Sequence, residues 1–200
     1  MHRLVPILAL SALCIPALAQ TSTVVVPNGY ANTVGNSNNA FPWNRATASM
    51  RYQQIYDTSN FTLQGINYPI LIQGLRFRPY PGAVTSWTGG SWPNIRVDMA
   101  TCPTDYSAAS TTFANNLGAN AQTVLQGQVT VAAGSTLGAG VLVPWHVNVP
   151  FSTPFLYDPT LGGDLTMDVY LDGTGWTGGG RACDVVSTAG LAREIGRAHV

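Results

Sequence analysis

Pro, Gly and Asn interrupt this chain at such short intervals that no long helix fits between them. Between these interruptions, apolar and polar residues alternate with a period of two, most clearly over 95–99, 145–149 and 165–171. In a strand, this alternation places apolar side chains on one face and polar side chains on the other. Strands with one apolar and one wet face form antiparallel sheets, and two such sheets stacked on their apolar faces make a sandwich. The sequence therefore predicts an all-β protein, an antiparallel and jelly-roll-like β-sandwich.

Residues 1–19 have the composition of an export signal. Arg3 gives a positive start, an apolar run follows, and Ala17-Leu18-Ala19 forms a small-x-small cleavage site. Pro6 and Pro16 interrupt the apolar run, which is shorter than the roughly 20 apolar residues of a membrane-spanning helix. The signal is expected to be cleaved, so that the mature protein is extracellular or at the cell surface and has no membrane span.

The other end of the chain, residues 194–200, resembles the translation of a common sequencing adapter. Glu194 is the only Glu in the chain, which favours this interpretation over an ordinary polar C-terminus. The natural sequence is then expected to stop near Arg193, leaving one β-domain over residues 20–193 that is incomplete at its C-terminus.

Residues 20–193 carry seven Arg, eight Asp and no Lys, so their charge is almost balanced. A balanced and sparse charge excludes the basic surface that nucleic acids or anionic membranes attract. The length is that of one domain with a substantial core.

Two cysteines remain after the signal, because Cys14 leaves with it. Cys102 and Cys183 are an even number in an oxidising compartment, which favours a disulfide. Closing that loop would contribute roughly 4–5 kcal/mol. The alternative is a pair of buried thiols that pack as small apolar side chains.

Six short motifs occur in a characteristic order along the mature chain. They are VVVPNG (24–29), NSNNAFP (36–42), RYQQ (51–54), GLRFRP (74–79), FANNLG (113–118) and PFLYDP (154–159). Together they resemble an uncharacterised family of exported β-sandwich proteins from planctomycetes and similar environmental bacteria. The resemblance implies a C-terminal sorting signal of the Pro-Glu-Pro type, expected in the missing part of the chain, and it supplies no catalytic residues.

Aromatic residues in Gly-rich segments are the strongest candidates for ligand contact. Trp87 and Trp92 bracket the segment 88–91, Trp176 stands among glycines, and Tyr80 is near in sequence. Indole faces can stack on sugar rings, and their N–H groups can donate to hydroxyls. This pattern indicates carbohydrate binding. The alternative is that these rings cap the core, since Trp is highly buried on average.

Asp164 and Asp172 lie in Gly-containing turns, where carboxylates and backbone carbonyls suit calcium. The sequence predicts no cofactor, and a structural calcium ion at these turns is the one candidate. The alternative is that each Asp-Gly pair only forms a hairpin turn.

Catalytic residues are hard to assemble from this sequence. Asp98 and Asp168 are expected on the wet faces of strands, and nothing in the Asp spacing selects the pair of carboxylates that glycoside hydrolysis needs. His146 is expected on a wet face too, and no Gly-x-Ser-x-Gly elbow is present. The expected function is a non-enzymatic module for extracellular or cell-surface structure, adhesion or glycan contact. Its expected partners are glycans or cell-surface components, and a secreted Asp-dependent polysaccharide hydrolase is the alternative.

Overall fold

The computed structural model describes residues 22–44, 49–187, 190 and 192–198. The expected signal peptide, residues 1–19, lies outside these residues. None of the helices in the described part is long and apolar enough to cross a membrane.

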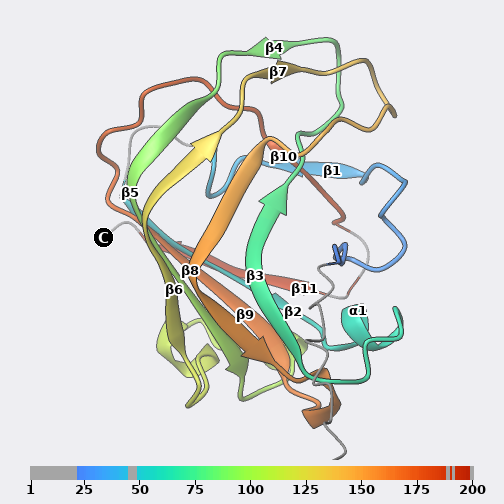
Figure 1. Cartoon of the computed structure of the whole chain (residues 1–200), viewed down its shortest axis with the longest axis vertical. Helices are drawn as coiled ribbons and strands as arrows, with labels where there is room; N and C mark the ends of the chain where they lie inside the picture. The colour runs from blue at the N-terminus through green and yellow to red at the C-terminus, as the bar shows by residue number, and fades with distance from the viewer. Residues whose placement is uncertain (1–21, 45–48, 188–189, 191, 199–200) are drawn as a thin grey trace, which may run out of the picture.

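One large antiparallel sheet dominates the structure (Figure 1). Its strands, in spatial order, are β11 (Ala192–Ala198), β2 (Met50–Tyr56), β9 (Asp164–Leu171), β5 (Gly90–Cys102), β6 (Gln122–Val131), β8 (Val147–Tyr157) and β3 (Ile70–Phe77). Six of these strands, from β2 to β3, curl into a half-barrel, and β11 pairs with β2 at one edge. Residues 194–198, expected to be foreign to the natural chain, thus lie within β11. The prediction of an antiparallel β-protein is confirmed, although the arrangement is not clearly a sandwich.

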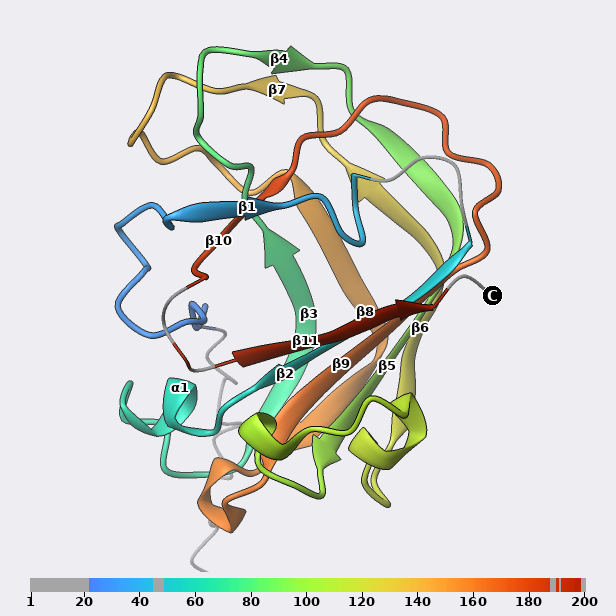
Figure 2. The same ribbon diagram turned by 180° about the vertical axis from the view of Figure 1, so that it is seen from behind.

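Two small sheets lie beside the half-barrel (Figure 2). The strand β1 (Ser37–Asn39) pairs with β10 (Cys183–Val185), and β4 (Ser86–Trp87) pairs with β7 (Gly134–Ser135). The short helices are α1 (Ser59–Thr62) and the 3-10 helices η1 (Tyr106–Ala108), η2 (Phe113–Asn116) and η3 (Pro159–Leu161). The β4–β7 sheet lies at one end of the half-barrel, where the candidate site is found.

The curl of the large sheet coincides with irregularities in its pairing. The register between β5 and β6 shifts twice, between Trp92 and Ile95 and between Val97 and Asp98. Such bulges bend a strand and increase its twist. The curved inner face then encloses one apolar core, whose largest members include Trp43, Trp92, Phe155 and Tyr157.

The predicted alternation is visible on the inner face. In β9, Leu165, Met167, Val169 and Leu171 are all buried in the core. On the other face Thr166 and Asp168 are buried as well and Tyr170 is half-buried, because the segment 103–121, which carries η1 and η2, covers part of the outer face (Figure 2). The outer face of β9 is therefore not the wet surface that the sequence predicts.

Candidate functional site

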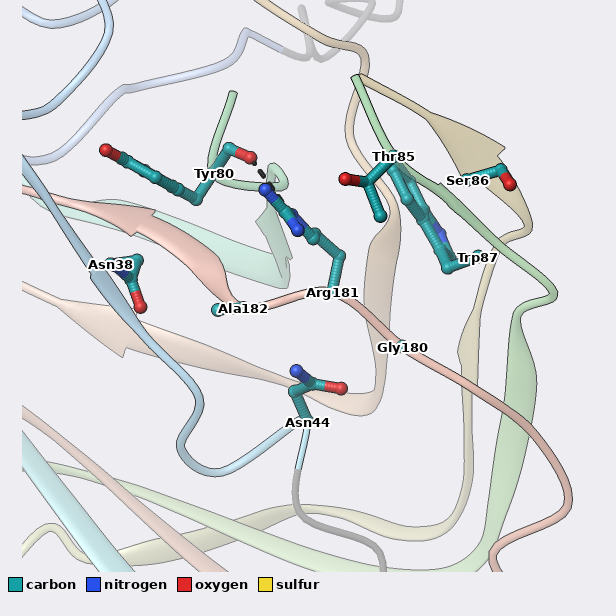
Figure 3. A pocket seen from close by; sticks show the side chains of 9 residues that line it. All are labelled: Asn38, Asn44, Tyr80, Thr85, Ser86, Trp87, Gly180, Arg181 and Ala182. Atoms are coloured by element: carbon teal, nitrogen blue, oxygen red, sulfur yellow. Dashed lines mark hydrogen bonds between the residues drawn. The ribbon is translucent and has the colours of Figure 1, made fainter. Parts of the chain in front are cut away.

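A pocket of about 290 Å³ lies beside the β4–β7 sheet (Figure 3). Three segments that are distant in sequence form its wall: the β1 region, the connection from β3 to β4, and the residues before β10. The lining residues are Asn38, Asn44, Tyr80, Thr85, Ser86, Trp87, Gly180, Arg181 and Ala182. The wall therefore combines aromatic, hydroxyl and amide groups with one cation, and it contains no carboxylate.

Backbone hydrogen bonds hold the segment that carries Arg181. Tyr80 N donates to Ala182 O at 2.8 Å. The Asn44 amide, oriented to satisfy both of its neighbours, donates to Gly180 O and accepts from Ala182 N, each at 3.1 Å. The backbone on both sides of Arg181 is thus fixed before any ligand arrives.

The side chain of Arg181 is the one cation of the pocket. Its Nε donates to Tyr80 O at 3.3 Å, and Figure 3 shows the guanidinium between Tyr80 on one side and Thr85 with Trp87 on the other. Asp184, the nearest acid along the chain, accepts instead from Arg78 Nε at 3.1 Å. No ion pair found among the described residues includes Arg181, so its charge is not neutralised by a protein carboxylate.

His146 lies behind the pocket and is 3 % exposed. The expectation of a surface histidine is wrong, because the residue precedes β8 and packs edge-on to Trp87, with ring centroids 5.7 Å apart. Its Nε2 lies 3.0 Å from Arg181 O and its Nδ1 lies 3.0 Å from Phe77 O. A neutral imidazole carries one ring proton and donates to one of these two carbonyl oxygens, whereas an imidazolium donates to both. The ring of His146 thus packs against the backbone of Arg181.

Burial lowers the pKa of His146, while the two carbonyl contacts act in the opposite direction. The unfolded chain therefore binds a proton on this residue more readily than the folded chain does. The contribution of His146 to stability should be present above its unfolded pKa of about 6.5 and should be lost as the pH falls below it.

We predict that the free energy of unfolding, from urea titrations at pH 7.5 and 5.5, falls more steeply with acid in the wild type than in His146→Gln. Titration of the carboxyl groups changes the stability of both proteins equally, so it cancels in this comparison. A wild type that gains stability on acidification relative to His146→Gln would show instead that an imidazolium donates to both carbonyls.

The four predicted aromatic residues do not form one platform. Tyr80 and Trp87 line the pocket, but the Trp87 indole N–H is already used, donating to Ala132 O at 2.6 Å. Trp92 is 1 % exposed and packs against Trp176, with ring centroids 4.9 Å apart. Trp92 is therefore a core residue, which was the alternative interpretation, and Trp176 packs over its ring.

Cys102 and Cys183 are both buried and free, so the expected disulfide is not formed. Cys183 belongs to the main core, whereas Cys102, the last residue of β5, packs with Ile55 and Ala109 in a separate apolar cluster. Burial raises the pKa of Cys183 to about 12, which leaves it an unreactive thiol.

Asp164 and Asp172 lie at opposite ends of β9 and cannot share one ion. Asp164 accepts from Thr58 N at 2.8 Å and also from Tyr106 N, while Asp172 accepts from Thr174 N at 2.9 Å. Within the described residues, no group of three or more His, Cys, Asp or Glu side chains could hold a metal ion. Asp172 caps the turn that follows it, and Asp164 anchors two loop N–H groups.

Asp98 and Asp168 are brought together, because they face each other across β5 and β9. Asp168 is fully buried rather than on a wet face, and Arg51 Nη2 donates to its Oδ2 at 2.6 Å. Burial raises the pKa of Asp168 and the neighbouring Asp98 acts in the same direction, while Arg51 opposes both. Gln53 links this pair to Asn116 in the covering segment, donating to Asp168 Oδ2 and accepting from Asn116 Nδ2. This cluster fastens the segment 103–121 to the sheet.

A second hollow, of about 420 Å³, lies on the outer face around Arg96 and Tyr170. The Arg96 guanidinium stacks 3.7 Å from the centroid of the Tyr170 ring, and Arg96 pairs with Asp98 at 3.1 Å. Its cation is thus already neutralised, unlike Arg181 in the first pocket.

Sequence reasoning missed Asn38, Asn44 and Arg181 as site residues. The only local signal was a lone cation directly after the glycines 178–180. No protein-family model, curated protein or solved structure matches this chain, so no relative marks these residues.

Proposed function

We propose that this protein is an exported, non-enzymatic β-module that contacts glycans through the Arg181 pocket. The observation that carries this proposal is the composition of the wall, where the rings of Tyr80 and Trp87 flank a cation and several hydroxyl and amide groups. Sugar recognition combines aromatic faces with donors and acceptors for ring hydroxyls. The backbone of this wall is fixed by hydrogen bonds, which favours binding without rearrangement.

The cellular location proposed for the module rests on its sequence. We propose that the signal over residues 1–19 exports the protein to the extracellular space or the cell surface, as in the planctomycete-like family that its motifs resemble. We also propose that the small β1–β10 and β4–β7 sheets act as a partial second layer, so that the half-barrel works as a sandwich-like module.

Tyr80→Ala is expected to weaken glycan binding by at least tenfold while the protein stays folded. The matched control is Tyr68→Ala, because Tyr68 is 58 % exposed and does not line the pocket. Binding would be measured by calorimetry on the mature chain, with glycans selected on an array, and folding by thermal melting. Equal losses in both variants, or no glycan binding by the wild type, would contradict the proposal.

A secreted polysaccharide hydrolase remains a second candidate because β5 and β9 place Asp98 opposite Asp168. Against it, Asp168 is fully buried and accepts hydrogen bonds from Arg51 and Gln53, so it faces no open space. Release of reducing sugar that disappears in a folded Asp98→Asn variant would favour the hydrolase over the binding module.

A further inference from the structure

We infer that the pocket binds the carboxylate of an acidic sugar, a hexuronate unit of a polysaccharide, through the guanidinium of Arg181. This inference rests on the proposed glycan-binding function and adds the chemical class of the ligand.

Arg181 carries a positive charge that no carboxylate of the described residues neutralises. Three other arginines of the described chain pair with an aspartate at 3.1 Å or less: Arg51, Arg78 and Arg96. Arg181 has no such partner there, and no carboxylate lines its pocket. An unneutralised cation in a partly enclosed polar pocket is an attractive site for an anion.

Hydrogen bonds hold Arg181 in a defined orientation. Its backbone is held through Gly180, Ala182 and His146, and its Nε donates to Tyr80 O. Nη2 lies close to Gly82, and neither terminal nitrogen has a hydrogen-bond partner among the described residues. A planar guanidinium offers parallel N–H groups that match a planar carboxylate, and holding it in place beforehand reduces the entropy lost on binding.

The surroundings of Arg181 favour a carboxylate on a sugar over a more highly charged anion. One cation balances one carboxylate, whereas a phosphate dianion is usually held by several cations or by a row of backbone N–H groups. Asn38 and Ser86 are exposed at the pocket and present an amide and a hydroxyl. These groups suit the hydroxyls of a pyranose ring.

The experiment compares four glycan probes on the mature, folded chain by calorimetry. The probes are oligogalacturonate, its methyl ester, a neutral galacto-oligosaccharide and a sulfated galactan oligosaccharide. Oligogalacturonate should bind best, and methyl esterification should weaken binding by about 10–100-fold, because it removes the charge and keeps the sugar. Arg181→Gln should weaken oligogalacturonate binding by a similar factor and weaken binding of the ester much less. Arg76→Gln, on an exposed arginine of β3 outside the pocket, should change neither.

Each other outcome overturns a defined part of the proposal. Equal binding of the acid and its ester, unaffected by Arg181→Gln, overturns the acidic-sugar inference and leaves glycan binding in place. Preference for the sulfated probe overturns the assignment to a carboxylate. Failure of all four probes to bind a folded wild type overturns the proposed function itself.

A second variant covers the case in which Arg181→Gln does not fold. Arg181→Lys keeps the charge and loses the planar fork, so it should bind oligogalacturonate with intermediate affinity. Wild-type affinity for oligogalacturonate should also fall as salt rises, while affinity for the ester stays constant. An affinity for oligogalacturonate that does not respond to salt overturns the inference without any variant.

Discussion

Replacing Arg51 with methionine is expected to lower the free energy of unfolding by about 3–5 kcal/mol at pH 7, because it leaves a buried carboxylate without its cation. Asp168 is 0 % exposed and receives three guanidinium contacts from Arg51, the shortest being 2.6 Å. Arg51 also stacks on Phe113 and Tyr170, at 4.7 and 4.6 Å from their ring centroids. Urea unfolding followed by circular dichroism measures the loss.

The pH dependence of this loss identifies its cause. Burial already raises the pKa of Asp168, and removing Arg51 removes an opposing influence. The carboxyl group of the variant should therefore accept a proton more readily, so the loss should be smaller at pH 4.5 than at pH 7.

The double variant Arg51→Met/Asp168→Leu should recover most of the lost stability, because it removes both charges. Arg76→Met, on an exposed arginine, is the control, with an expected change within about 0.5 kcal/mol. A loss below about 1 kcal/mol in Arg51→Met would contradict the role of this pair.

The Arg51–Asp168 pair also shows where sequence reasoning stops. The period-two pattern correctly assigned Met167 and Val169 to the core and Asp168 to the opposite face. It could not show that the segment 103–121 covers that opposite face. A loop has no periodicity that reveals which surface it packs on, so the same alternation fits a wet face and a covered one.

The candidate site could not be predicted from the sequence, for a related reason. Its wall joins residues near 38–44, 80–87 and 180–182, which no local motif connects. His146 was misplaced because the strand expected from the alternation over 145–149 starts only at Val147. The curl of the sheet depends on bulges whose positions composition does not reveal. The fold class was predictable from local pattern, but the contacts that build the pocket are long-range.

Replacing Trp92 with alanine is the other change with a large expected effect, a loss of about 3–5 kcal/mol in the free energy of unfolding. Trp92 is 1 % exposed and is among the largest side chains of the core. Its truncation leaves a cavity in the half-barrel and removes the surface on which Trp176 packs. Thermal melting and urea titration, with Trp145→Ala as a control at a ring that is 37 % exposed, measure this loss.

Trp92→Phe separates the packing of this ring from its polar atom. Trp92 Nε1 has no hydrogen-bond partner among the described residues, and burying an unsatisfied N–H costs about 1–3 kcal/mol. Phenylalanine removes that N–H and fills most of the volume, so Trp92→Phe should lose less than half of the free energy of unfolding that Trp92→Ala loses.

Trp176 belongs to the same connection as Arg181, so Trp92→Ala should also weaken oligogalacturonate binding, whereas Trp92→Phe should preserve it. If Trp92→Ala kept full stability and lost only the ligand, Trp92 would be a sugar contact, as the sequence first indicated, and not a support of the core.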